Sequence, residues 1–412
     1  MPPIDPIYIG RDAIAALLQY CQAHALNRFA LIADTNTYAA LGERVETALK
    51  AQGYDVTSII LTGDEIIADE AYIVHALRYA PLGPCTFLAV GSGTLTDITR
   101  FVSHRTGRAF ISLPTAPSVD GFTSIGAPLV LRGVKLTVTC QPPIALFADL
   151  ETLTHAPHRL VAAGYGDMIG KFTALADWEM GSLLWAEPFD RQIADWVKTT
   201  VASCIAQTEA VGQQTEEGVK GLLAALVDSG LAMLQFGSTQ PASGAEHHVS
   251  HFWEMRFLLE GRPAALHGAK VGYALAIIAA QYARLRAVTR PELLDRLEAA
   301  TFDREAEIAA IRQGHGVLAE DIIQGHRQFL EMTPENFDQL KHRIVDQWDA
   351  IQAIAARVPP PEQIITWLKQ AGAITEAKDL GLSEQEVQDG LQYGHYLRNR
   401  FTVLKLNRIL GI

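Results

Sequence analysis

Cysteine is scarce in this sequence, and the few cysteines form no recognisable pair. The four residues, Cys21, Cys85, Cys140 and Cys204, stand far apart, and no CxxC motif occurs. This spacing favours neither a zinc knuckle nor a dense disulfide framework. We therefore expect reduced thiols, as in a cytosolic protein.

Positive charge and long hydrophobic runs are lacking as well. The 34 Lys and Arg residues stand against 46 Asp and Glu, for a net charge of −12, and they are dispersed. Nucleic-acid binding needs basic patches, so we expect no such partner. No uncharged apolar run reaches the roughly 18 residues of a membrane helix. The N-terminus, MPPIDPIYIG, has neither the basic nor the apolar segment of a signal peptide. We expect a cytoplasmic protein without a membrane partner.

What the sequence does contain is a change of pattern after its first third. Short β-rich runs alternate there with amphipathic segments, whereas apolar residues at helical spacing dominate from about residue 157 onward. Alternation of this kind predicts βαβ units and a mainly parallel sheet. We predict an α/β dinucleotide-binding domain over residues 1–155 and an all-α domain over residues 156–412. The expected strands lie within 28–34, 54–63, 85–93, 108–118, 131–140 and 143–150.

A glycine-containing turn follows one of these strands, in LAVGSGTLTDITRF (88–101). Unpaired backbone N–H groups at the start of the following helix can bind a pyrophosphate. The candidate residues are Gly91, Gly93, Thr94 and Asp97. Thr96 stands where the third glycine of a GxGxxG motif would be, so a tight strand-to-helix turn is the alternative.

Two further positions sit at the carboxyl ends of expected strands, where parallel sheets bind ligands. Asp34 could accept hydrogen bonds from an adenosine ribose, or it could cap a helix. The loop LPTAPSVDGFTS (113–124) is dense in hydroxyl groups and carries one carboxylate. Its candidate ligands are Thr115, Ser118, Asp120 and Ser124; capping of turns is the alternative.

Histidines gather in GAEHHVSHFWEMRFLLEGRPAALHGAK (244–270). His247 and His251 are one helical turn apart on one face, and His267 begins a separate element. With Asp167, which we expect early on a helix, His247 and His267 would form a carboxylate–imidazole–imidazole metal site with an open coordination position. His251 would stand nearby as a hydrogen-bonding group.

Each of these residues also has an alternative interpretation. Asp167 and Lys171 could form an ordinary ion pair one turn apart, and the histidines could be polar residues inside a helical bundle. His248 points about 100° away from His247. We expect it to be solvated or outside the first coordination shell.

The motifs GSGTLTD, PTAPSVDGFTS, GYGDMIGKFTALADW, SGAEHHVSH and HGAKVG occur in that order. Together they resemble the sn-glycerol-1-phosphate dehydrogenases, whose fold is shared with iron-containing alcohol dehydrogenases and dehydroquinate synthases. The resemblance covers about residues 5–280, and the chain beyond residue 290 is more similar to the longer bacterial members than to the shorter archaeal ones. One departure is Ser92, where the family usually has glycine.

The resemblance implies roles for individual residues. Gly93 to Asp97 would hold the dinucleotide pyrophosphate, and Thr115 to Ser118 together with Ser124 would contact NAD. Asp167, His247 and His267 would bind the metal, which could be zinc, nickel or iron. Asp120, Asp167 and His251 would contact the substrate and take part in catalysis. Lys171 or Arg262 could bind the substrate phosphate.

The implied reaction is reversible hydride transfer from NADH or NADPH to dihydroxyacetone phosphate, which gives sn-glycerol 1-phosphate as a backbone for lipid synthesis. The resemblance also implies a homodimer. A glycerol or other polyol dehydrogenase of the same fold is the first alternative. A lyase of the dehydroquinate synthase type, or a nucleotide-binding protein without catalysis, is the second.

Overall fold

The structure, a computed structural model, describes residues 4–412 and divides into two compact units. Unit 1 comprises Met1–Met168 and Ala206–Gly237, and unit 2 comprises Ile169–Ile205 and Ser238–Ile412. These bounds differ from the division expected near residue 155. The difference arises because the segment Ala206–Gly237 returns to pack with residues of unit 1 rather than with the later helices. The function assigned to each part stays a prediction.

Unit 1 contains a six-stranded parallel sheet in the order β1-β8-β5-β4-β2-β3. Its strands are β1 (Ile7–Gly10), β2 (Arg28–Asp34), β3 (Asp55–Leu61), β4 (Thr86–Gly91), β5 (Phe110–Pro114) and β8 (Ala145–Asp149). The predicted fold class, a parallel α/β unit followed by helices, is confirmed. The short edge strand β1 was not anticipated from the sequence.

A separate antiparallel hairpin is made by β6 (Gly126–Leu131) and β7 (Val134–Thr139). The chain reverses through Arg132 and Gly133, both with positive φ, of 54° and 74°. Two such residues in succession match the twist of a two-residue hairpin turn. The β-rich run at 131–140 therefore belongs to a hairpin outside the parallel sheet.

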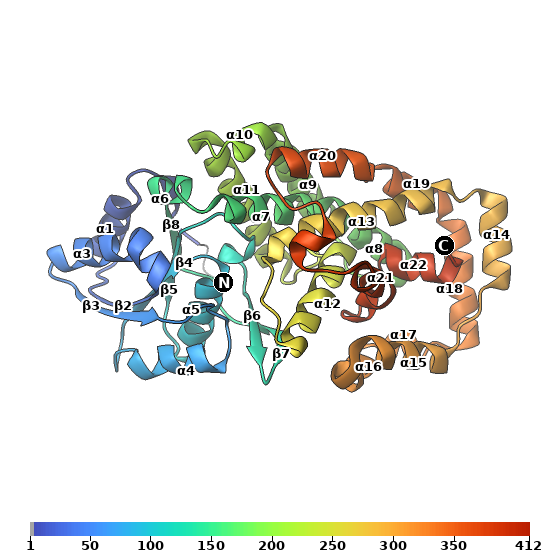
Figure 1. Cartoon of the computed structure of the whole chain (residues 1–412), viewed down its shortest axis with the longest axis horizontal. Coiled ribbons are helices and arrows are strands. Elements are labelled where there is room, and N and C mark those ends of the chain that lie inside the picture. Colours follow the sequence, from blue (N-terminus) through green and yellow to red (C-terminus); the bar gives the residue numbers. More distant parts are fainter. Residues whose placement is uncertain (1–3) are drawn as a thin grey trace. The chain divides into compact units, whose positions relative to one another are not determined.

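Helices cover both faces of the sheet (Figure 1). On one face, α1 (Ala13–Ala23) and α3 (Glu43–Ala51) bury Leu17, Val45 and Leu49 against alternate residues of the strands. On the other face, α4 (Glu70–Tyr79) and α5 (Gly93–Arg105) bury apolar side chains against the intervening strand residues. Both faces are therefore apolar, as expected when helices flank a parallel sheet. The remaining helices of unit 1 are α2 (Thr35–Thr37), η1 (Tyr38–Gly42), η2 (Gly121–Thr123), α6 (Leu150–Thr154), α7 (His158–Ile169), α10 (Thr208–Gly212) and α11 (Glu216–Phe236).

Within the part of the chain that the structure describes, α11 is the one helix long and apolar enough to cross a membrane. More than half of its most apolar window is buried in the protein. The Thr123 hydroxyl also donates a hydrogen bond to the Val227 carbonyl of α11, at 2.9 Å. These contacts are those of a core helix of unit 1.

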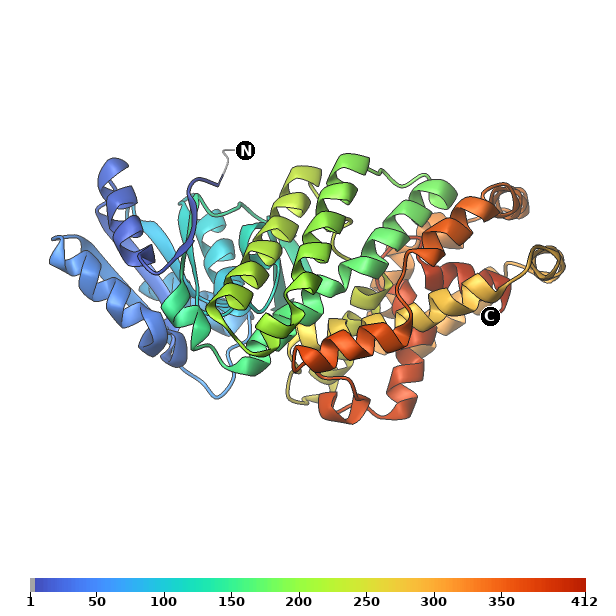
Figure 2. The same ribbon diagram turned by 90° about the horizontal axis from the view of Figure 1, so that it is seen from above.

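Unit 2 is helical, and no strand occurs among its described residues (Figures 1 and 2). Its α-helices are α8 (Lys171–Trp185), α9 (Arg191–Ala206), α12 (Ala245–Glu260), α13 (His267–Ala287), α14 (Arg290–Ala299), α15 (Arg304–His315), α16 (Ala319–Gly325), α17 (Arg327–Leu330), α18 (Pro334–Asp346), α19 (Trp348–Ala356), α20 (Pro361–Gln370), α21 (Glu384–Tyr393) and α22 (Val403–Leu410). Short 3₁₀ turns are η3 (Gly316–Leu318), η4 (Ala377–Leu380) and η5 (Gly394–Tyr396).

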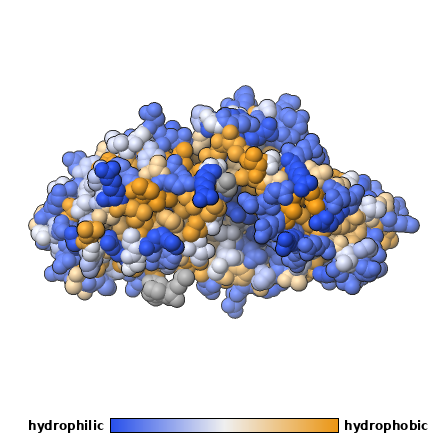
Figure 3. Space-filling view, turned by 90° about the horizontal axis from the view of Figure 1, so that it is seen from below, coloured by the Kyte–Doolittle hydropathy of each residue, from blue (hydrophilic) through white to orange (hydrophobic). Residues whose placement is uncertain are grey.

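Hydrophobic residues are also present on the surface. Figure 3 shows one face on which hydrophobic patches alternate with hydrophilic ones. In unit 1, Val74, Leu77 and Tyr79 of α4 and Leu82 after it are exposed, Leu82 by 89%. Single exposed apolar residues are common on protein surfaces, and these four lie on one helix or directly after it.

Four helices of unit 2 meet at the carboxylate of Asp177, a fully buried residue of α8. Its Oδ1 accepts hydrogen bonds from the Tyr282 hydroxyl of α13 at 2.6 Å and from the Val403 N–H of α22 at 2.7 Å. Its Oδ2 accepts one from the Ala245 N–H of α12 at 2.7 Å. Burial, together with repulsion from Glu246, raises the pKa of Asp177 to about 7.

Replacing Asp177 by Asn should destabilise unit 2, because an NH₂ group would face at least one N–H or O–H donor. We expect Asp177→Asn to lower the free energy of unfolding by about 1–3 kcal/mol, the usual penalty for a buried unpaired polar group. Urea unfolding of both proteins measures the difference. Tyr282→Phe is the matched control, since it removes a single donor and leaves the carboxylate with two. An Asp177→Asn protein as stable as the parent would refute the role given to this carboxylate.

Candidate active site

The candidate dinucleotide residues lie at the point where the strand order of the sheet reverses. From β2 the chain proceeds to β3 on one side and then returns to β4 on the other side of β2. Parallel sheets bind ligands at the carboxyl ends of the strands flanking such a point. Here those ends carry Asp34 on β2 and Gly91 on β4, and Gly91 is in register with Pro114 of β5.

The turn between β4 and α5 leaves little room for side chains. A Cβ atom on Gly91 would lie 2.6 Å from the Cβ of Leu95, and one on Gly93 would lie 3.1 Å from a methyl carbon of Val119. Ser92 has φ −95° and ψ −150°, an extended conformation open to any residue. The turn therefore accommodates the serine that departs from the family pattern. The N–H groups of the first turn of α5, at Gly93 and Thr94, begin here, as an anion site requires.

Asp97 and Arg100 connect this helix to the loop that follows β5. Arg100 is fully buried, and its Nη1 donates to Asp97 Oδ1 at 3.0 Å and to the Gly126 carbonyl at 2.8 Å. Its Nη2 donates to the Gly121 carbonyl at 2.6 Å. Burial raises the pKa of Asp97 to about 7, against the attraction of Arg100. Asp97 thus holds a buried arginine, and its predicted pyrophosphate contact stays a prediction.

Asp34 caps the helix that follows β2. Its Oδ1 accepts a hydrogen bond from the Thr37 N–H at 2.7 Å, and the Thr37 hydroxyl oxygen accepts one from the Asp34 N–H at 2.9 Å. The capping alternative is therefore realised. Oδ1 of Asp34 accepts the capping hydrogen bond, and Oδ2 could still accept one from a ribose hydroxyl. The predicted ribose contact stays a prediction.

The loop after β5 is buried and attached to α7. Thr115, Ser118, Asp120 and Ser124 are each less than a tenth exposed. Asp120 donates its N–H to Asp167 Oδ2 at 3.1 Å and accepts a hydrogen bond from the Ser229 hydroxyl at 2.8 Å. A Cβ on Gly164 of α7 would lie 1.8 Å from the Pro117 carbonyl oxygen, so only glycine fits there. The loop and α7 are therefore in direct backbone contact.

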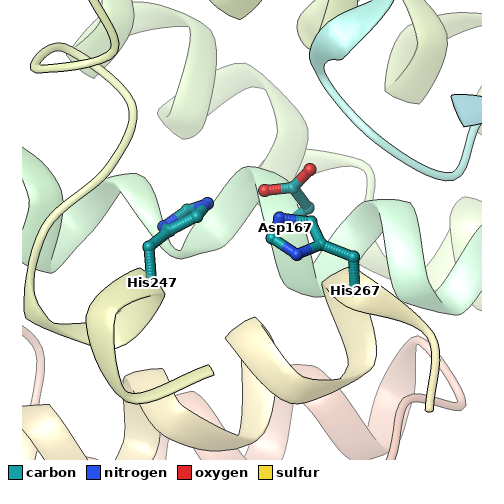
Figure 4. Close-up of side chains that lie close together, drawn as sticks. All are labelled: Asp167, His247 and His267. Carbon is teal, nitrogen blue, oxygen red and sulfur yellow. The ribbon is translucent and has the colours of Figure 1, made fainter. Parts of the chain in front are cut away.

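The three predicted metal ligands come together (Figure 4). Asp167, His247 and His267 each offer one ligand atom, and these atoms lie within 4.8 Å of one another. Asp167 lies near the end of α7 rather than early on a helix, and Lys171 begins the next helix, α8, which corrects the expected i, i+4 arrangement. His247 lies in the first turn of α12, and His267 is the first residue of α13.

The hydrogen bonding of His247 fits a metal ligand. Its Nδ1 lies 2.7 Å from Glu246 Oε1, a geometry that keeps the proton on Nδ1 and leaves Nε2 to bind a metal. Glu246 is fully buried and also accepts hydrogen bonds from Thr173 Oγ1 at 2.6 Å and the Gly244 N–H at 2.7 Å. Burial alone would raise the pKa of Glu246, but the hydrogen bonds, first that of His247, hold it below its ordinary value. Sequence reasoning missed Glu246, although its place beside His247 was visible.

Of the two remaining histidines of α12, His251 lies at the candidate metal site and His248 lies in the core. The His251 ring lies 5.3 Å from the His267 ring and 6.2 Å from the His247 ring, between ring centroids. His248 is fully buried, and burial holds its pKa well below the ordinary value. Solvent exposure of His248, one of the two placements expected, is therefore wrong, because α12 is enclosed on that side as well.

The two candidates for the substrate phosphate, Arg262 and Lys171, lie in different surroundings. The Arg262 guanidinium pairs with Glu260 at 2.9 Å and with Glu386, and it lies 4.0 Å from the centroid of the Phe257 ring. Lys171 is fully buried at the start of α8, four residues after Asp167. The assignment of either residue to the substrate phosphate stays a prediction.

Glu246→Gln should weaken metal binding while leaving the fold intact, because the amide keeps the acceptor for His247 but removes the charge. Loss of such an outer-shell carboxylate typically lowers metal affinity roughly 10- to 100-fold. Competition with a chromophoric chelator measures the affinity for zinc. Glu335→Gln, which removes an exposed carboxylate of α18 in the same unit, should leave the affinity unchanged. Equal affinities of Glu246→Gln and the parent would show that Glu246 does not act on the metal.

The fold is that of a known class of oxidoreductases. The structure is similar to the crystal structure of a probable glycerol dehydrogenase from Sinorhizobium meliloti, with a TM-score of 0.60 and 17% sequence identity over 98% of this chain and 95% of the other. Residues 8–157 match the model of the iron-containing alcohol dehydrogenase family. The family match covers the strands of the parallel sheet, and the similarity to the solved structure extends over the helical unit as well.

Two curated relatives identify one enzyme family within this class of oxidoreductases. The glycerol-1-phosphate dehydrogenase, NAD(P)+, of Halalkalibacterium halodurans is 40% identical over 97% of this chain and 91% of the relative. That of Geobacillus stearothermophilus is 37% identical over 100% of this chain and 94% of the relative. The chain belongs to the glycerol-1-phosphate dehydrogenase family.

Proposed function

We propose that this protein catalyses the reversible NAD(P)H-dependent reduction of dihydroxyacetone phosphate to sn-glycerol 1-phosphate, which supplies a glycerophosphate backbone for lipid synthesis. The observation that carries the proposal is the convergence of Asp167, His247 and His267 in a chain of this family. One carboxylate and two imidazoles leave a coordination position open, as a catalytic rather than a structural site does.

The side chains of the site have distinct tasks in this proposal. Asp167, His247 and His267 hold one divalent metal, zinc, nickel or iron, which supplies a Lewis acid for the C2 oxygen of the substrate. Glu246 keeps His247 in the tautomer that can bind. Asp120, fixed by its N–H to Asp167 and by Ser229, orients a substrate hydroxyl. His251 hydrogen bonds to the substrate oxygens and relays the proton, a task suited to imidazole near neutral pH.

The cofactor in this proposal is NAD or NADP, bound at the carboxyl ends of β2, β4 and β5. The first turn of α5 faces the pyrophosphate with Gly91, Gly93 and Thr94, and the loop after β5 contributes Thr115, Ser118 and Ser124. Asp34 at the adenosine ribose would repel a 2′-phosphate and so favour NAD. Lys171 is the cation assigned to the substrate phosphate.

The remaining parts of the proposal concern the state of the protein in the cell. It is expected in the cytoplasm, without nucleic-acid or membrane partners, as a homodimer. The dispersed basic residues and the net charge of −12 support the absence of a nucleic-acid partner. The exposed apolar residues of α4 support association with a second copy.

The reaction is tested by supplying dihydroxyacetone phosphate with NADH or NADPH after reconstitution with zinc, nickel or iron. We expect oxidation of the cofactor and formation of the sn-1 enantiomer. Formation of the sn-3 enantiomer would contradict the proposal even if turnover were fast. Glycerol oxidation in place of dihydroxyacetone phosphate reduction would favour the polyol dehydrogenase alternative. No net hydride transfer with any metal would favour the lyase or the non-catalytic protein.

His267→Ala should remove bound metal and turnover together, because a single carboxylate and a single imidazole hold a divalent ion weakly. We expect turnover to fall by more than roughly 100-fold, beyond the loss caused by outer-shell changes. NADH binding, followed by fluorescence, should survive, since α5 and the sheet are untouched. His342→Ala, an exposed position on α18, serves as control. A His267→Ala protein with full activity and no metal would refute the assigned site.

A further inference from the structure

A second set of ligand-type side chains lies in unit 2 beside the first. His251, Glu254 and His267 each offer one atom, and these atoms also lie within 4.8 Å of one another. His251 and Glu254 are three residues apart on α12, and His267 begins α13. Glu254 has no role in the reaction as described so far, and its neighbours decide what it can do.

Glu254 connects a histidine of α12 to a lysine of α13. Its Oε2 lies 3.1 Å from His251 Nδ1, and its Oε1 lies 3.3 Å from Lys270 Nζ. The Lys270 side chain is 1% exposed, and that of Glu254 is 14% exposed. Each of these buried charges stabilises the other, because an unpaired charge at this depth would be strongly destabilising.

This pairing opposes a second metal ion at Glu254. A divalent cation bound there would lie close to the Lys270 ammonium and would compete with it for the carboxylate. It would also have to share His267 with the first group. The carboxylate is therefore better explained as a hydrogen-bond acceptor for His251 than as a ligand.

The hydrogen bond has a definite consequence for His251. A proton on Nδ1 donated to Glu254 leaves Nε2 as the unprotonated nitrogen of the neutral ring, and it fixes the ring in one orientation. The ring is also stacked on His267, with an interplanar angle of 26°. An imidazole held in one tautomer and one orientation gives a substrate hydroxyl a single, fixed acceptor.

We propose that Glu254, itself held by Lys270, is a positioning residue that sets the tautomer and orientation of His251 for the substrate. This inference rests on the proposed function, in which His251 contacts the substrate. It adds that the contact is made through Nε2. It also pairs two of the three histidines of α12 with separate carboxylates: Glu246 orients His247 for the metal, and Glu254 orients His251 for the substrate.

Steady-state kinetics of dihydroxyacetone phosphate reduction by Glu254→Gln provides the first test. We expect kcat to fall roughly 10- to 100-fold with little change in KM, because the lost orientation matters most in the transition state. Metal content should stay at one ion per chain. Glu254→Asp should recover part of the loss. Glu260→Gln, which removes an outward-facing charge from the same helix, should behave as the parent.

A single substitution at Glu254 removes a negative charge that lies 3.3 Å from the buried Lys270 ammonium, and this loss could unfold the unit. The double variant Glu254→Gln with Lys270→Met removes both charges and should show the same loss of kcat in a folded protein. An unchanged kcat in this variant would overturn the proposal. A loss of one of two metal ions per chain would also overturn it and would identify Glu254 as a ligand.

Nitrogen-15 NMR of the histidine-labelled protein separates this inference from the proposed function. The His251 resonances, assigned by their absence in His251→Asn, should report a protonated Nδ1 in the parent and a mixture of tautomers in Glu254→Gln. This signature does not depend on turnover, so it tests the positioning role even if dihydroxyacetone phosphate is not reduced. A protonated Nε2 in the parent would refute the inference.

Discussion

Two buried carboxylates hold the first turn of α12, and the candidate metal site depends on them. Asp177 accepts the Ala245 N–H, and Glu246 accepts the Gly244 N–H and the His247 ring. The carboxylates are close to each other: a Cβ on Gly244 would lie 2.8 Å from Asp177 Oδ2 and 2.9 Å from Glu246 Oε2. Their mutual repulsion is offset by the donors that converge on them. The first N–H groups of a helix normally lack a partner within the helix. Here two of them donate to Asp177 and Glu246, and Glu246 in turn orients His247.

The parallel sheet fixes the positions of the candidate cofactor residues. Parallel strands deliver Asp34, Gly91 and Pro114 to one edge, and the reversal of strand order lies next to β4. Arg100 then fixes the loop after β5 to the helix after β4 through buried hydrogen bonds to backbone carbonyls. The glycine turn and the hydroxyl-rich loop are thus one connected structure, although about twenty residues separate them in the chain.

Much of this arrangement could be predicted from the sequence because it depends on local patterns. The strand over Arg28–Asp34 was predicted to the residue, and the i, i+4 spacing of His247 and His251 correctly indicated one helix face. Other features depend on residues that meet only in the folded chain. Glu254 and Lys270 are ordinary charged residues in the sequence, and their pairing requires α12 and α13 to be adjacent. The return of residues 206–237 to unit 1 and the burial of His248 depend on tertiary packing in the same way.

The backbone contacts of α7 carry a consequence for how ligands influence one another. The helix meets the loop after β5 at Gly164 and Pro117, and three residues later it presents Asp167, which accepts the N–H of Asp120. The loop and the helix are thus rigidly connected, with hydroxyl groups at one end and the candidate metal ligand Asp167 at the other. A ligand that shifts the loop changes the position of that carboxylate, so the free energies of binding at the two ends are linked. If both proposed sites are correct, the affinity for the metal would change when the dinucleotide binds.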